Sequence, residues 1–76
     1  MTIGDIIDKK DYDYVEYRLS INQKDIFAGA FASKNGTIIS LDGDVYSKDE
    51  EVLRYEEWSN PDKGVQNGLT VVVKYP

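Results

Sequence analysis

A two-residue alternation along residues 14–21 constrains the fold of this chain more than any other feature of its sequence. Apolar side chains alternate there with mostly polar ones, in the order Tyr14, Val15, Glu16, Tyr17, Arg18, Leu19, Ser20 and Ile21. A period of two is typical of a β-strand with one buried and one solvated face. The segment therefore predicts a sheet with a core on one side, and the tyrosines at 12 and 14 are expected on its solvated face.

Turn-forming residues divide the next part of the chain into strands. Asn22–Asp25 predicts a turn, and residues 26–32 predict a second strand, whose small side chains around Gly29 indicate close packing by another element. Asn35–Gly36 predicts a tight hairpin, because both central residues of a type I′ turn need positive φ. Residues 37–41 then predict a third strand, antiparallel to the second.

The second half of the chain is less regular. Ser47 and Glu50 have the spacing of a capping box, which predicts a helical turn over Ser47–Glu51, and a strand is expected from there to Trp58, although residues 47–58 also suit a helix. Asn67 and Gly68 predict a second tight turn. The run LTVVVKY over 69–75 predicts a last strand, either central in the sheet or covered by the N-terminal helix.

The N-terminus predicts a short helix over Ile3–Lys9. Thr2 can cap it, and Asp5 lies in the first turn, where a negative charge interacts favourably with the helix dipole. Together these elements predict an α+β fold: a short N-terminal helix packed on a four- or five-stranded, mostly antiparallel sheet. The length of 76 residues predicts one small domain over 1–76, and the absence of cysteine excludes disulfides as a source of stability.

The residue types argue against catalysis and cofactors. Without histidine or cysteine, the usual general base and the strongest nucleophile are missing, and a pocket that could bury Glu50–Glu51 or Glu56–Glu57 as an acid–base pair is hard to build in a chain this short. Asp42, Asp44 and Asp49 do not have the spacing of a calcium loop. We therefore expect no enzyme activity, no cofactor and no metal, and a polar turn around Asp42 in which aspartates cap backbone amides.

The charge pattern restricts location and partners. The first residues contain no apolar stretch long enough for a signal sequence, and no run approaches the roughly 20 apolar residues of a membrane span, so we expect a cytoplasmic, soluble protein without a membrane partner. A pI near 4.5 argues against direct nucleic-acid binding, which depends on clustered Lys and Arg.

All of the net charge of −5 lies in residues 42–57, where seven acids face Lys48 and Arg54; the remaining residues carry seven acids and seven bases. Carboxylates attract a basic partner, and aromatic rings beside them supply contact area. The predicted partner-binding residues are Asp42, Asp44, Tyr46, Asp49, Glu50, Glu51, Tyr55, Glu56, Glu57 and Trp58. Carboxylates repeating every second residue of one strand have about half the charge density of a DNA strand, so mimicry of nucleic acid needs acids from other elements.

Four segments carry a resemblance: TIGDIID, DYVEYRLS, ISLDGDVYSKDEEVLRYEEW and NGLTVVVKY. Their layout resembles the small acidic accessory proteins of phages and mobile elements of Firmicutes, some of which are anti-CRISPR or other anti-defence inhibitors. The resemblance implies a non-enzymatic inhibitor in a bacterial host, whose acidic surface occupies the basic nucleic-acid channel of a defence nuclease.

Two alternatives remain open. In the first, the chain is a self-assembling structural or interaction module, for example a homodimer, in which an edge strand or the valine-rich last strand pairs with another copy. In the second, a small ligand binds between protomers through dispersed basic residues, namely Arg18, Lys24, Lys34 and Arg54.

Overall fold

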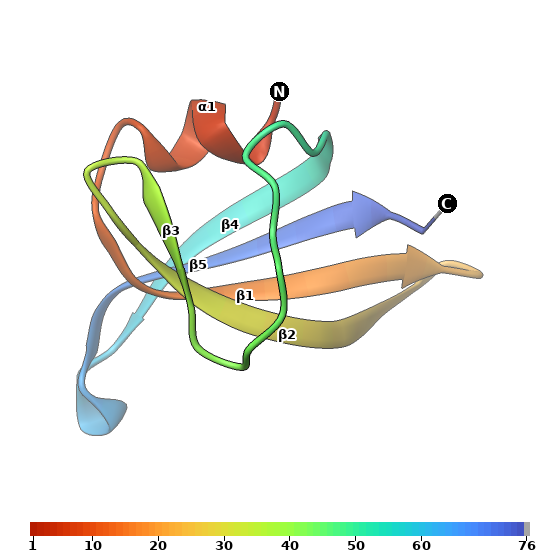
Figure 1. The fold of residues 1–76 in the computed structure, drawn as a ribbon. Coiled ribbons are helices and arrows are strands. Elements are labelled where there is room, and N and C mark those ends of the chain that lie inside the picture. The colour runs from red at the N-terminus through yellow and green to blue at the C-terminus, as the bar shows by residue number, and fades with distance from the viewer. Residues whose placement is uncertain (76) are drawn as a thin grey trace.

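A computed structural model describes residues 1–75 as one short helix and one five-stranded sheet (Figure 1). Along the chain its elements are α1 (Ile3–Ile7), β1 (Tyr12–Ile21), β2 (Lys24–Lys34), β3 (Thr37–Ser40), β4 (Val52–Asn60), a short 3-10 helix η1 (Pro61–Lys63) and β5 (Val65–Lys74). The α+β class fits this arrangement, and most of the chain is sheet.

The strands lie in the order β3-β2-β1-β5-β4, and the sheet is mixed. Three neighbouring pairs are antiparallel, whereas β1 and β5 run parallel, side by side in the middle of the sheet (Figure 1). The valine-rich strand β5 therefore has a neighbour on each side, as its apolar run predicts. Only β3 and β4 are edge strands.

Helix α1 covers one face of the sheet, called here the helix face. Thr2 caps it, as predicted, and Asp5 in the first turn completes a reciprocal capping box; the helix ends at Ile7, before the predicted end at Lys9. Its isoleucines are buried with strand residues in one core, which consists of Ile3, Ile6, Ile7, Tyr12, Val15, Phe31, Val52, Leu69, Val71 and Val73. The opposite face of the sheet has no covering element among residues 1–75 and is called the open face.

The predicted position of Tyr12 on the solvated face is wrong: its side chain is 3% exposed and belongs to the core. Strand β1 has a bulge between Tyr12 and Val15, which pair with Ser33 and Phe31 on β2. The extra residue restarts the alternation, so Tyr12 and Val15 both face the helix.

Residues 41–51 cross the helix face between β3 and β4 (Figure 1, green to cyan) and are called the crossing segment. Tyr46 packs there against Tyr17 and Phe31, with ring centroids 5.1 and 5.0 Å apart. A Cβ on Gly29 would come closer than 3.0 Å to Tyr46 and Asp42, which confirms that another element packs closely on this strand. The predicted turn over Ser47–Glu51 is present as a single hydrogen-bonded turn, in which the Glu50 N–H donates to the Ser47 carbonyl at 3.3 Å, and strand β4 follows it as expected.

The predicted turn at Asn67–Gly68 is also wrong, since both residues lie inside β5. Gly68 pairs with Trp58 on β4, and a Cβ on Gly68 would be 2.6 Å from the indole ring. The glycine therefore makes room for the tryptophan. The backbone N–H of Asn67 donates to the Asp13 carboxylate at 3.0 Å, which fixes the start of β5 beside β1.

No helix in residues 1–75 is long and apolar enough to cross a membrane.

Candidate acidic and aromatic contact surface

The ten predicted partner-binding residues lie in three places. Asp42, Asp44 and Tyr46 belong to the crossing segment; Asp49, Glu50 and Glu51 form the turn before β4; Tyr55, Glu56, Glu57 and Trp58 lie on β4. The structure does not unite them in one surface, because the alternation of β4 sends its residues to both faces of the sheet.

Asp42 organises the crossing segment. Its carboxylate accepts hydrogen bonds from the backbone N–H of Ala30 at 2.9 Å and of Asp44 at 3.0 Å, from Ser40 Oγ at 3.1 Å and from the Tyr46 hydroxyl. These donors, the Tyr46 hydroxyl first, lower the pKa of Asp42 to about 2. The predicted capping role is confirmed for Asp42, whose carboxylate is thus used within the chain.

The turn before β4 meets the N-terminal helix. The backbone N–H groups of Ile3 and Gly4 donate to the carbonyls of Glu50 and Lys48, at 3.0 and 2.9 Å, and Val52 N–H donates to the Met1 carbonyl at 2.8 Å. This pairing brings the turn's acids beside those of α1 and its C-cap. The resulting group, called the acidic end, consists of Asp5, Asp8, Asp49, Glu50 and Glu51.

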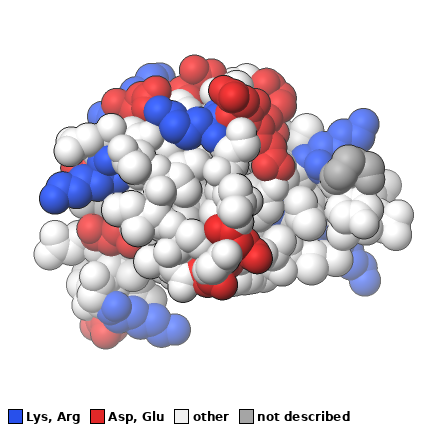
Figure 2. Space-filling view, viewed as in Figure 1, with Lys and Arg blue, Asp and Glu red and all other residues white. Residues whose placement is uncertain are grey.

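Figure 2 shows acidic side chains gathered at the top of the molecule, where α1 lies in Figure 1, with basic side chains among them. Lys48 Nζ lies 2.9 Å from Asp8, and the Met1 ammonium pairs with Glu51. The carboxylate of Glu50 accepts a hydrogen bond from the Tyr17 hydroxyl. Among the described residues, the side chain of Asp49 has no hydrogen bond or ion pair.

On the helix side of β4, Glu57 accepts a hydrogen bond from the Tyr12 hydroxyl at 2.7 Å and lies 3.7 Å from Lys10 Nζ. The Tyr12 hydrogen bond first, and then the Lys10 charge, lower the pKa of Glu57. Tyr55 is 45% exposed, and neither it nor Glu56 makes a side-chain hydrogen bond or ion pair within residues 1–75. Among the predicted residues of β4, these are the two whose side chains have no such partner in residues 1–75.

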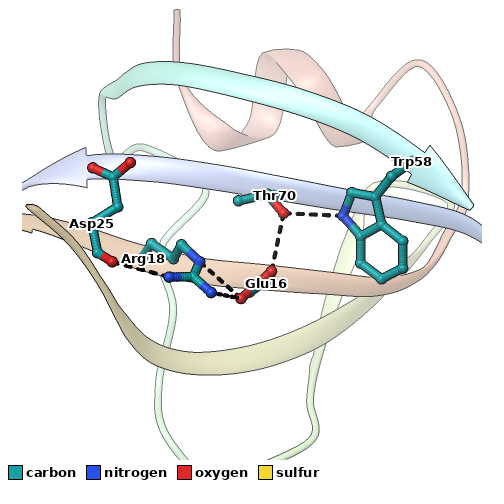
Figure 3. A network of polar contacts seen from close by, with 5 residues as sticks. All are labelled: Glu16, Arg18, Asp25, Trp58 and Thr70. Atoms are coloured by element: carbon teal, nitrogen blue, oxygen red, sulfur yellow. Dashed lines mark hydrogen bonds and ion pairs between the residues drawn. The ribbon is translucent and has the colours of Figure 1, made fainter.

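Trp58 belongs to a polar network on the open face (Figure 3). Its indole N–H donates to Thr70 Oγ1 at 3.0 Å, and that hydroxyl donates to Glu16 at 3.1 Å. Arg18 donates to Glu16 and, at 3.0 Å, to the carbonyl of Asp25. Trp58 is therefore held by its own sheet rather than projecting as a free anchor.

Arg18 and Arg54 line one hollow of about 360 Å³ on this face together with Asp25. The Asp25 carboxylate pairs with Arg54, as Glu16 pairs with Arg18. Two of the four dispersed basic residues thus meet in space, but carboxylates of the same chain neutralise both.

The sequence interpretation missed Asp5 and Asp8 as members of the acidic surface. No local pattern reveals their position, because it results from pairing between residues 1–4 and 48–52, far apart along the chain. Among residues 1–75, no three acidic side chains converge in a geometry that could hold a metal ion.

We expect the protein to unfold cooperatively in alkali. Burial first, and then the neighbouring carboxylates of Glu57, Glu50 and Asp42, raise the pKa values of Tyr12, Tyr17 and Tyr46 above 10. Their contribution to stability is complete below pH 10, where tyrosines of the unfolded chain also stay protonated, and is lost as the pH rises above 10 towards the folded-state values.

The measurement is tyrosinate absorbance and circular dichroism followed together against pH. Tyr17→Phe should make the loss of stability above pH 10 shallower, whereas Tyr75→Phe, at an exposed position, should leave it unchanged. Tyrosinate absorbance that rises fully before the circular dichroism changes would contradict the expectation.

Comparison with known proteins finds no matching protein family, no curated protein and no solved structure.

Proposed function

We propose that this chain is a non-enzymatic inhibitor that binds a basic protein surface through the acidic end. The observation that carries the proposal is the pairing of residues 1–4 with 48–52, because it adds the carboxylates of Asp5 and Asp8 to the predicted acids of the turn. Carboxylates from two elements supply the higher charge density that a single strand lacks.

The proposed partner is a bacterial nuclease of a defence system or another nucleic-acid-binding protein. A channel built for phosphate is lined by Lys and Arg and attracts carboxylates for the same electrostatic reason. The resemblance to accessory proteins of phages and mobile elements, based on sequence layout, favours an anti-CRISPR-like role in the cytoplasm of a bacterial host. The proposal does not depend on Tyr46 or Trp58, which pack on the chain's own sheet.

The first test is a pull-down with tagged protein from a bacterial lysate, eluted with a salt gradient, followed by an activity assay of each nuclease that is recovered. We expect a nucleic-acid-binding protein that elutes as salt screens the contact and that the added chain inhibits. Recovery of this chain alone, or of a nuclease that stays fully active, would overturn the proposal.

A charge variant tests whether the acidic end makes the contact. Asp49→Lys with Glu51→Gln raises the net charge by three without removing a contact to Tyr12 or Tyr17, and we expect it to weaken binding by roughly tenfold or more. Asp62→Lys with Gln66→Lys makes the same change in net charge at exposed positions on and beside η1 and should bind almost normally. Equal affinities of the two variants would show that only the overall charge matters.

The fold limits which strands could join two copies in the alternative, a self-assembling module without an inhibitory role. The valine-rich strand β5 lies between β1 and β4 and cannot pair with another copy. Any pairing between copies must use an edge strand, β3 or β4.

A further inference from the structure

A second hollow on the open face, of about 410 Å³, lies at the end of the sheet where β4 is followed by η1. It is called the aromatic hollow and is lined by Tyr14, Glu16, Trp58, Asn60, Lys63 and Val65. Strand β4 begins beside the N-terminal residues, where Val52 meets Met1, and ends at η1 (Figure 1). The aromatic hollow is therefore separate from the acidic end.

The floor of the hollow is the indole ring of Trp58. Tyr14, Gly68 and Trp58 lie directly opposite one another on β1, β5 and β4. A Cβ on Gly68 would be 2.6, 2.6 and 2.7 Å from three carbons of the indole, so the ring lies face-on over the glycine. Figure 3 shows the ring over β5. Its second face is therefore turned away from the sheet, towards solvent.

Tyr14 forms a wall beside this floor. The centroids of the two rings are 6.0 Å apart, and the ring planes make an angle of 63°. The indole is fixed in place, because its N–H donates to Thr70 Oγ1 at 3.0 Å. Floor and wall form a corner in which a small apolar ring can contact both aromatic side chains, and the fixed indole loses little entropy on binding.

Hydrogen-bond donors surround this corner. The Tyr14 hydroxyl, the Asn60 amide and the Lys63 ammonium line the hollow, and none of them makes a hydrogen bond or ion pair within residues 1–75. Asn60 precedes η1 without capping it. A hydroxyl and an amide can each donate a hydrogen bond, and an ammonium can only donate.

The one carboxylate of the lining is already used. Glu16 accepts hydrogen bonds from Arg18 and from the Thr70 hydroxyl, and Arg18 neutralises its charge. Lys63 is therefore the charged group of the lining that has no partner in residues 1–75. A matching ligand offers hydrogen-bond acceptors, few donors and a negative charge.

We propose that the aromatic hollow binds a proline-rich segment of another protein, in the polyproline II conformation, with an acidic residue beside the prolines. Proline rings pack on the indole floor and the Tyr14 wall. The backbone carbonyls of such a segment accept hydrogen bonds from Tyr14 and Asn60, and proline has no N–H that would need an acceptor. Lys63 pairs with the acidic residue. This role adds to the inhibitory one proposed above and does not depend on it.

Two other classes of ligand match the hollow less well. Sugars also pack on aromatic rings, but their hydroxyls donate as well as accept, and the Glu16 carboxylate is occupied by Arg18 and Thr70. A quaternary ammonium ion is attracted by aromatic rings, but Lys63 repels it and Glu16 offers no free negative charge.

Titration with a synthetic peptide tests the proposal, and the fluorescence of Trp58, the single tryptophan of the chain, reports binding. The probe is hexaproline with a glutamate on each side and both ends blocked. We expect a Kd of about 1 mM or lower, because the contact is small. The same peptide with alanine in place of proline should bind at least about tenfold more weakly.

No change of fluorescence up to about 10 mM of the proline peptide would overturn the proposal. Equal binding of the alanine peptide would overturn it too, because the contact would not depend on proline. Maltohexaose and tetramethylammonium test the other two classes, and tighter binding of either one than of the proline peptide would also contradict the proposal.

Substitutions in the lining locate the contact. Tyr14→Ala removes the wall and should weaken binding of the peptide about tenfold, whereas Tyr75→Ala, at an exposed position outside the hollow, should leave it unchanged. Asn60→Ala removes a donor that makes no cap bond, so it should keep the fold and weaken binding about threefold or more. Normal affinity in both lining variants would overturn the assignment.

A matched peptide with glutamine in place of glutamate tests Lys63. At low salt the glutamate peptide should bind about threefold more tightly, and Lys63→Gln should remove the difference. Equal binding of the two peptides to the natural chain would overturn the role of Lys63. The Asp49 and Glu51 variant that tests the inhibitory role lies outside the hollow and should bind the peptide normally, so the two proposals fail separately.

Discussion

Phe31→Ala should lower the free energy of unfolding more than truncation of any exposed side chain, by about 3–5 kcal/mol. The Phe31 side chain is completely buried in the core on the helix face, where the crossing segment covers it. Truncating a buried phenylalanine costs about 3–5 kcal/mol, because apolar area and packing contacts are lost together. A domain of this size has a total free energy of unfolding of about 4–11 kcal/mol, so one such loss removes much of it.

Phe27 on the same strand is the matched control. Its ring is 46% exposed, so Phe27→Ala should lower the free energy of unfolding by no more than about 1 kcal/mol. Urea denaturation followed by the fluorescence of Trp58 measures both variants. A similar loss for the two phenylalanines would contradict the burial of Phe31 under the crossing segment.

Gly29→Ala should be the most damaging single-methyl substitution in the sheet. The residue has φ of +147°, which L side chains rarely adopt, and a Cβ there would collide with the Tyr46 hydroxyl and the Asp42 carboxylate. Displacing these groups loosens the crossing segment over the core. We expect a loss of about 3 kcal/mol or more, combining backbone strain with overpacking.

Gly43→Ala separates the two causes of that loss. Gly43 also has positive φ, +86°, but a Cβ there would meet nothing within 4 Å. Only backbone strain of about 1–2 kcal/mol is then expected. Denaturation curves of the two variants give the difference directly, and equal losses would show that Tyr46 and Asp42 move aside at little cost.

Local signals in the sequence predict local structure well. The alternation after Tyr14 predicts β1 and the capping residue Thr2 predicts α1, and the structure confirms both elements. The Asn35–Gly36 hairpin is confirmed by φ values of +53° and +75°. Each depends on residues within a few positions of one another, so a single sequence contains the whole cause.

Contacts between distant residues account for the predictions that failed. Gly68 looks like a turn residue, yet it lies in a strand because Trp58 needs the space above it. The bulge that buries Tyr12 depends on pairing between β1 and β2. The parallel pairing of β1 with β5 has no local signature, and the acidic end arises only when residues 1–4 meet 48–52.

The parallel pair in the middle of the sheet has a consequence for how this chain reaches its native state. Strands β1 and β5 are neighbours although Glu16 and Thr70 are 54 positions apart, so the centre of the sheet forms only after a long loop has closed (Figure 1). During synthesis on a ribosome, β1 emerges long before β5, and its apolar face stays without this neighbouring strand until β5 has been made. Folding should therefore be limited by this late closure, at rates slower than those of helical domains of equal size.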